Sequence, residues 1–165
     1  MELESADGAI VRLRPVRYQF AGSANTGAGR DWDANWLIIH GDIRTADSGS
    51  WSFADPCLTT REARLVSAWL RAAASAAAPP SGRGDRHAMP PAAFTEPNLE
   101  LTLQDSTLTE AVISVRFSLE SLPPWIRRGS AAARGGYVVT LCVPHGKLTR
   151  AADDWDREIA EFPER

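Results

Sequence analysis

Lysine, cysteine and long apolar runs are scarce in this sequence. Lys147 is the only lysine among 18 basic residues, and the formal net charge at neutral pH is −3. A surface that binds nucleic acid is usually broadly basic, so we expect no direct contact with nucleic acid. No apolar run approaches the roughly 18 residues that a membrane-spanning helix requires, and the acidic start MELESADGAI is unlike a signal peptide. We therefore expect a cytoplasmic protein that does not contact a membrane.

The two cysteines, Cys57 and Cys142, lack the CxxC spacing of a metal or redox site. Their apolar neighbours favour two buried, reduced thiols over a disulfide. A thiol could still act as a nucleophile if His40, His87 or His145 met it in space. The motifs GxSxG, HExxH and GxxxxGK[ST] are absent as well, so we expect no enzymatic activity, no metal and no cofactor.

The length and composition are those of one globular domain. With 165 residues and 44% apolar content, the chain can bury a core of its own. We predict a single domain over residues 1–165. Within it, the segment 76–93 is rich in proline and glycine, which predicts a flexible loop.

Two amphipathic helices are predicted, over residues 60–75 and 149–162. Thr59 and Glu62 have the spacing of a capping box, in which each residue satisfies a main-chain N–H of the other. The apolar stripe of the first helix is formed by Leu65, Val66, Trp69, Leu70 and Ala73. The second helix repeats apolar residues at spacings of three and four and ends before Pro163.

Alternation of apolar and polar residues predicts antiparallel strands with one buried face. Near the N-terminus, Asp7 and Gly8 suit the tight turn of a hairpin. The clearest alternating sets are Leu99, Leu101 and Leu103, then Ile113, Val115, Phe117 and Leu119, and finally Tyr137, Val139, Leu141 and Val143. Strands and helices together predict an α+β fold: one antiparallel sheet of about six strands, with both helices packed on one face.

The stretch RDWDANWLIIHGD raises the possibility of a calcium loop. Asp31, Asp33, Asn35 and Asp42 fall at positions where an EF-hand supplies oxygen ligands. However, Trp36 occupies the position at which the sharp turn of that loop needs glycine, and the residues after it suit a strand. The pattern favours polar side chains that cap or turn the backbone before a strand.

Two carboxylates are each followed by proline, Asp55 in FADPC and Glu96 in FTEPN. Paired carboxylates can act as acid and base when they share a cleft, and His40 could complete such a site. This would make the chain a small-molecule-binding or enzymatic domain. The alternative is that each acid accepts main-chain hydrogen bonds at a turn before its proline.

Acidic residues are concentrated at the C-terminal end. The last fifteen residues hold six acids against Arg157 and Arg165, a net charge of −4. Asp154, Glu158 and Glu161 are spaced to share one helical face, which could meet a basic partner. However, any surface helix has a polar face toward solvent. These three acids could therefore simply be solvated and bind no other protein.

Six blocks in fixed order are similar to bacterial WapI-family immunity proteins. These blocks are YQF, DWDANWLIIHGDI, WSFADPCLTTRE leading into AWL, FTEPNLELTL, VRFSLESLPPWI and the ending IAEFPER. The segment near 76–93 and the RGSAAARGG loop depart from the family pattern. The resemblance implies an antitoxin that binds the C-terminal toxic domain of a cognate secreted polymorphic toxin. In the system after which the family is named, the toxin domain is a nuclease that acts on transfer RNA, so the resemblance offers such a nuclease as one possible target of this chain.

An antitoxin needs a complementary surface rather than catalytic groups. An acidic face would suit a basic nuclease, because it would imitate the phosphates of the substrate. We therefore assign toxin contacts to Asp154, Glu158 and Glu161, together with Trp125 as an aromatic anchor, although Trp125 could equally belong to the core. We expect a monomer in the free state. The residues that we assign to the scaffold are Trp36, Asp55, Pro56, Glu96, Pro97, Asn98, Glu120 and Pro124.

Overall fold

The computed structural model describes residues 1–20, 32–47, 49–76, 89–126 and 130–165. In these ranges the chain forms two antiparallel sheets of four strands each. The first sheet consists of β1 (Glu2–Glu4), β2 (Ile10–Tyr18), β3 (Trp36–Arg44) and β4 (Ser50–Thr59). The second consists of β5 (Ala92–Ala93), β6 (Leu99–Ser106), β7 (Glu110–Phe117) and β8 (Tyr137–Pro144). The helical segments are α1 (Thr60–Ser75), α2 (Ala131–Gly135), α3 (His145–Ile159) and two 3-10 turns, η1 (Trp32–Asn35) and η2 (Leu119–Ser121).

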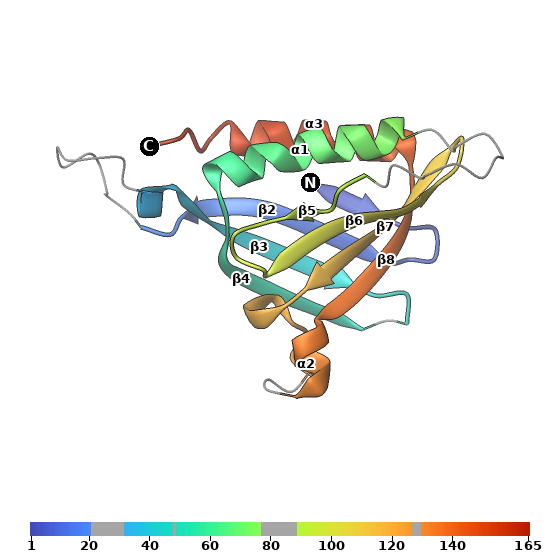
Figure 1. Ribbon diagram of the computed structural model, residues 1–165, viewed down its shortest axis with the longest axis horizontal. Coiled ribbons are helices and arrows are strands. Elements are labelled where there is room, and N and C mark those ends of the chain that lie inside the picture. The colour runs from blue at the N-terminus through green and yellow to red at the C-terminus, as the bar shows by residue number, and fades with distance from the viewer. Residues whose placement is uncertain (21–31, 48, 77–88, 127–129) are drawn as a thin grey trace.

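The two long helices lie side by side across the wide end of the molecule (Figure 1), and the sheets converge toward the opposite, narrow end near α2. Helix α1 contacts β4, β5 and β7, whereas α3 contacts β1, β2 and β8. The helices therefore bridge both sheets and close one core between them. Trp155 of α3 is fully buried, and its indole N–H donates to the Ala63 carbonyl of α1 at 2.7 Å.

The α+β class is confirmed, but the strands are divided differently from the prediction. We predicted about six strands in one sheet with the helices on one face, whereas the described residues form eight strands in two sheets. Alternation identifies the buried face of a strand but not its neighbour. Each sheet is built from strands that follow one another along the chain, and α1 separates the last strand of the first sheet from the first strand of the second.

The predicted helix over 60–75 is confirmed, and the second helix is shifted from 149–162 to His145–Ile159. Pro144 precedes this helix directly, so the chain passes from β8 into α3 without a loop. Phe162 lies beyond the helix end and packs edge-to-face on Tyr18, with ring centroids 5.5 Å apart. The predicted N-terminal hairpin forms, with Gly8 at φ 90°, although its turn spans Ser5 to Ala9 rather than two residues.

Two other sequence predictions differ from the structure or are only partly covered by it. Leu119 was predicted on the buried face of a strand, but it lies in η2 with φ 55° and is 48% exposed. Of the predicted loop over 76–93, residues 77–88 lie outside the described residues. Ala92 and Ala93 pair with β6 as strand β5.

Glu62 joins the start of α1 to the segment before β6. One carboxylate oxygen accepts the main-chain N–H and the hydroxyl of Thr59, which completes the predicted capping box. The other oxygen accepts the N–H and the hydroxyl of Thr95, both at 2.7 Å. Burial by itself raises the pKa of Glu62, but these four hydrogen bonds outweigh it and leave the pKa lowered.

Replacing Glu62 with glutamine should destabilise the protein by about 1 kcal/mol at pH 7, because an amide offers only one acceptor oxygen for the two threonines. The lowered pKa means that the stabilisation by the carboxylate is present above the pKa of the unfolded chain and is lost as the pH falls. The difference between the two proteins should therefore shrink on acidification. Urea denaturation at pH 7 and pH 4 measures it, with Glu164→Gln as an exposed control. A constant difference at both pH values would contradict this explanation.

Candidate functional site

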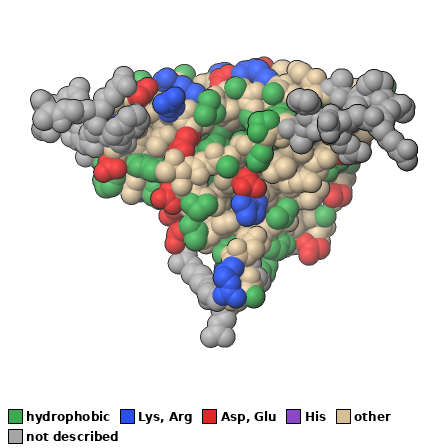
Figure 2. Space-filling view, viewed as in Figure 1, with side chains coloured by type: hydrophobic (Ala, Val, Ile, Leu, Met, Phe, Trp, Pro, Cys, Tyr) green, Lys and Arg blue, Asp and Glu red, His purple; other side chains and the backbone are tan. Residues whose placement is uncertain are grey.

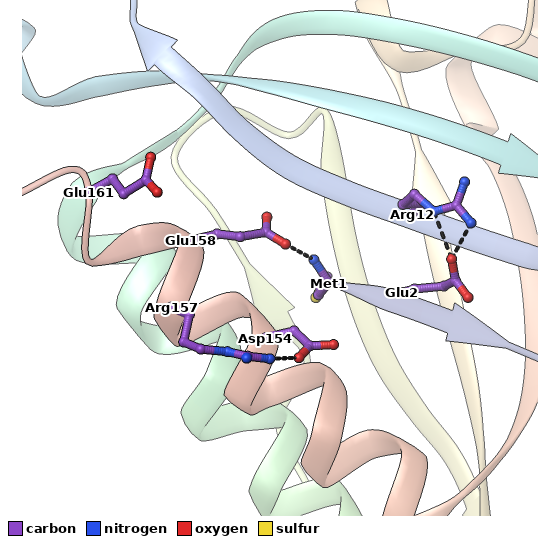
Figure 3. Close-up of a pocket in the computed structure, with 7 residues that line it drawn as sticks. All are labelled: Met1, Glu2, Arg12, Asp154, Arg157, Glu158 and Glu161. Atoms are coloured by element: carbon purple, nitrogen blue, oxygen red, sulfur yellow. Dashed lines mark hydrogen bonds and ion pairs between the residues drawn. The ribbon is translucent and has the colours of Figure 1, made fainter.

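A shallow groove runs between α3 and the first two strands (Figure 3). Its cavity measures about 400 Å³, and it is lined by Met1, Glu2, Arg12, Asp154, Arg157, Glu158 and Glu161. All three of the acidic residues predicted on the C-terminal face therefore line one surface. Their neighbours Met1, Glu2 and Arg12 come from the other end of the chain, so sequence spacing gave no indication of them.

The acidic residues of this groove are largely engaged within the protein. Glu158 accepts a hydrogen bond from the buried N-terminal ammonium of Met1 at 2.8 Å. Asp154 pairs with Arg157, one turn further along the helix. Within the part of the chain that the structure describes, Glu161 has no such partner. The face that the sequence predicted as a continuous acidic stripe thus carries alternating charges, with Glu161 as its unpaired carboxylate.

Residues 122–126, which follow η2, lie at the narrow end of the molecule and away from this groove (Figure 1), and they include Trp125. Its ring packs edge-to-face on Trp51, with centroids 5.5 Å apart, and on Tyr137 at 6.2 Å. The side chain nevertheless remains 48% exposed. The ring is thus partly packed on the core and partly exposed, and the four predicted contact residues do not form one surface.

The segment that carries Trp125 is held in a defined conformation. Ser121 donates from its hydroxyl to the Asn98 carbonyl at 2.6 Å, and its own carbonyl accepts the indole N–H of Trp51 at 2.9 Å. Leu119 adopts a left-handed backbone conformation, which is costly for a bulky residue and persists only where surrounding contacts impose it. An exposed aromatic side chain on such a segment loses little conformational entropy when it binds a partner.

Asn98 is the residue through which this segment is tied to the first sheet. Its amide N–H donates to Asp55 at 2.7 Å and approaches the sulfur of Cys57 at 3.7 Å. The main-chain carbonyl of Asn98 accepts hydrogen bonds from Ser118 N and from the Ser121 hydroxyl. These contacts bring the FADPC, FTEPN and SLESLPP blocks together.

The other residues assigned to the scaffold lie near this junction or at the ends of strands. Trp36 begins β3, and Pro56 pairs with Ile38 where the register of β3 and β4 shifts. Glu96 and Glu120 lie close enough to Cys57 to raise its pKa. Pro97 precedes Asn98 directly, and Pro124 is exposed beside Trp125.

Asp55, Glu96 and His40 do not form the site considered from the sequence. His40 pairs with Ala54 across β3 and β4, so these two side chains share a face of the sheet. Asp55 is the next residue along the strand and therefore points to the opposite face. The Nδ1 atom of His40 lies 3.3 Å from a carboxylate oxygen of Asp42, on its own face. A site that uses all three residues is excluded by this arrangement.

The calcium loop is also incompatible with the contacts of its third ligand. The side-chain oxygen of Asn35 accepts hydrogen bonds from the Thr60 hydroxyl at 3.1 Å and from Arg165 N at 2.8 Å. Asp33 and Asn35 lie in the turn η1, and Asp42 lies within β3, whereas Asp31 is outside the described residues. Among the residues that are described, no three His, Cys, Asp or Glu side chains are placed to hold a metal ion.

Replacing Asn98 with alanine should cost about 2–3 kcal/mol, because it removes the amide that the partly buried Asp55 carboxylate accepts from. Gln104→Ala is the matched control, since its exposed amide donates to Ser114 at 2.8 Å without joining the two sheets. Urea denaturation should show a loss of under about 1 kcal/mol for this control. Equal losses in the two variants would show that the junction at Asn98 has no special role.

The two thiols should differ in their reactivity toward a disulfide reagent at pH 8. Burial raises the pKa of Cys57 to about 12, with a smaller contribution from the nearby carboxylates, and its side chain is fully buried. The pKa of Cys142 is also raised, first by a hydrogen bond with Glu110, but this residue is only half-buried. We expect one thiol, that of Cys142, to react slowly in the folded protein. After denaturation both thiols should react. Cys142→Ser should abolish the reaction of the folded protein; if it does not, Cys57 is accessible.

Comparison with known proteins assigns the whole chain to one family. Comparison with curated proteins finds no match. Among the described residues, no helix is long and apolar enough to cross a bilayer. The model of the immunity protein WapI-like family matches residues 2–163, and the chain therefore belongs to this family.

Proposed function

We propose that this protein is an antitoxin that binds and neutralises the C-terminal toxic domain of a cognate secreted polymorphic toxin. Family membership over residues 2–163 is the observation that carries the proposal. The contacts of Asn98, Asp55 and Cys57 support it, because they give these polar residues a structural role within the fold. The protein would act in the cytoplasm, with one chain bound to each toxin domain.

The groove beside α3 is the first candidate contact. Glu161 is exposed and unpaired in the described structure, and it stands beside three further carboxylates, of Glu2, Asp154 and Glu158. A basic toxin surface could replace the exposed arginine partners of Glu2 and Asp154 with its own lysine and arginine side chains. A nuclease that acts on transfer RNA would have such a surface, because it must bind phosphates.

Trp125 is the second candidate contact, at the other end of the molecule. Half of its surface is available to a partner, while Trp51 and Tyr137 hold the ring in place from behind. Interface residues that contribute most to affinity are enriched in tryptophan, particularly where the free protein already holds them in the bound conformation. One toxin domain would contact both ends only by spanning the molecule, so the two surfaces can be tested separately.

The experiment is calorimetric titration of the purified chain with the C-terminal domain of the large secreted protein encoded beside it. We expect one-to-one binding. If the groove is the contact, Glu161→Lys should weaken binding about tenfold through loss of charge complementarity. If the narrow end is the contact, Trp125→Ala should weaken it about thirtyfold or more, the usual effect at a dominant aromatic residue.

Asp105→Lys is the matched control for charge, because it makes the same charge reversal on an exposed residue of β6. Glu158 is not a suitable position for a test, since its carboxylate holds the N-terminus and its loss would disturb the fold. Circular dichroism and the thermal midpoint verify folding of each variant. Absence of binding by the unmodified chain would contradict the antitoxin proposal for this pair. Binding that neither variant weakens would contradict both surfaces but not the function.

A further inference from the structure

Strand β8 forms one outer edge of the second sheet. The order of that sheet is β5-β6-β7-β8, so β8 pairs with β7 along one side only. An edge strand presents unpaired main-chain N–H and C=O groups to any other strand that approaches. Proteins usually protect such edges with short strands, charged side chains, proline or irregular register.

The other three edges of the two sheets carry these protections. Strands β1 and β5 are three and two residues long, and β4 contains Asp55 and Pro56 at a shift in its register with β3. In contrast, the stretch Tyr137–Val143 has no charged residue and no proline. Its register with β7 is unbroken over all eight residues of the strand. Strand β8 is therefore the regular, uncharged edge among the described strands.

The main-chain groups of alternate residues point to the outer side of β8. Cys142 identifies this side, because its N–H donates to the hydroxyl of Ser5, outside the sheet, at 3.1 Å. Since main-chain groups alternate along an antiparallel strand, those of Val138 and Thr140 point the same way. Within the described part of the chain, no other main-chain hydrogen bond to this side of the strand is found. Val138 is also 51% exposed, and Thr140 is exposed beside it.

We propose that two copies of this chain pair through this edge, with their β8 strands antiparallel about Val139. In that register Val138 of each copy faces Thr140 of the other, and the two residues exchange main-chain hydrogen bonds. In this register Cys142 faces Gly136 of the other copy, which lies outside β8 and whose N–H already donates to the Ala133 carbonyl, so Cys142 keeps its bond to Ser5. The two second sheets would join into one continuous sheet across a twofold axis, the commonest symmetry of protein dimers.

The structure supports a second copy of the chain as the partner of this edge. The β8 edge of that copy is identical, and it is therefore equally regular and equally uncharged. Antiparallel pairing about Val139 places valine opposite threonine and no like charges opposite each other, and such β-branched pairs are favourable in sheets. The nearest ion pair on the exposed face joins Arg116 to Glu100 at 2.6 Å and is already neutralised within one copy. Figure 2 views this face of the second sheet, where uncharged side chains predominate. From the sequence alone we expected a monomer, whereas the unprotected edge of β8 is a reason to expect a dimer.

Sedimentation equilibrium over a wide range of protein concentrations tests the proposal. We expect the mass to rise from the 17.9 kDa of one chain to twice that value as the concentration increases. The variant V138K/T140K should remain at the mass of one chain, because lysines on an edge strand repel an identical strand. The control T102K/Q104K places the same two charges on the same exposed face, but on β6, two strands away from the proposed contact, and should still dimerise.

Hydrogen exchange locates the contact independently. The amides of Val138 and Thr140 should exchange slowly at high concentration and rapidly on dilution or in V138K/T140K. A mass of one chain at every concentration would overturn the proposal. So would a dimer in which these two amides remain unprotected, since its interface would lie elsewhere. Protection of the two amides only after addition of the toxin domain would also overturn self-pairing and would assign the edge to a toxin strand.

Discussion

The hydrogen bonds of Asn98 connect the two sheets and determine the shape of the narrow end. Its side-chain amide donates to Asp55 of β4, its main-chain carbonyl accepts from Ser118 N and the Ser121 hydroxyl, and the Ser121 carbonyl in turn accepts from the indole of Trp51. Asn98 is almost fully buried, so each of these contacts replaces water that the polar groups would otherwise require. Trp51 is the ring on which Trp125 rests. The exposed aromatic surface at this end is therefore a consequence of the junction between the sheets.

At the wide end, most of the acidic side chains form ion pairs within the protein. Arg71 of α1 binds both Asp153 and Asp156 of α3, at 2.7 and 2.6 Å, and so joins the two helices. Glu158 holds the N-terminal ammonium, and Asp154 holds Arg157. The exposed pairs of Arg71 and of Arg157 each contribute little to stability, so a basic partner could replace them at small cost, whereas Glu158 holds a buried ammonium. The acidic composition of α3 is thus compatible with a binding role, but the carboxylate of Glu161 is the one that needs no rearrangement.

Local features of the fold could be predicted from the sequence, whereas long-range neighbours could not. The capping box of Thr59 and Glu62 placed the start of α1 correctly, because capping depends on residues three positions apart. The division into two sheets was missed, since alternation does not encode which strand lies beside which. The same limit applies to the candidate site. The pair of Asp154 with Arg157 is local, but Met1 and Glu158 are 157 positions apart and meet only through the packing of α3 on the first strands.

The blocks that identify the family and the surfaces offered to a partner are largely different residues. FADPC, FTEPN and SLESLPP converge on Asn98 and join the two sheets. Strand β8 and most of α3 lie outside these blocks, and Trp125 lies at the end of one. A protein that must match one particular toxin needs a surface that can change without loss of the fold. The junction at Asn98 allows this, because it fixes the geometry of both sheets through contacts that involve neither the exposed edge of β8 nor the groove beside α3.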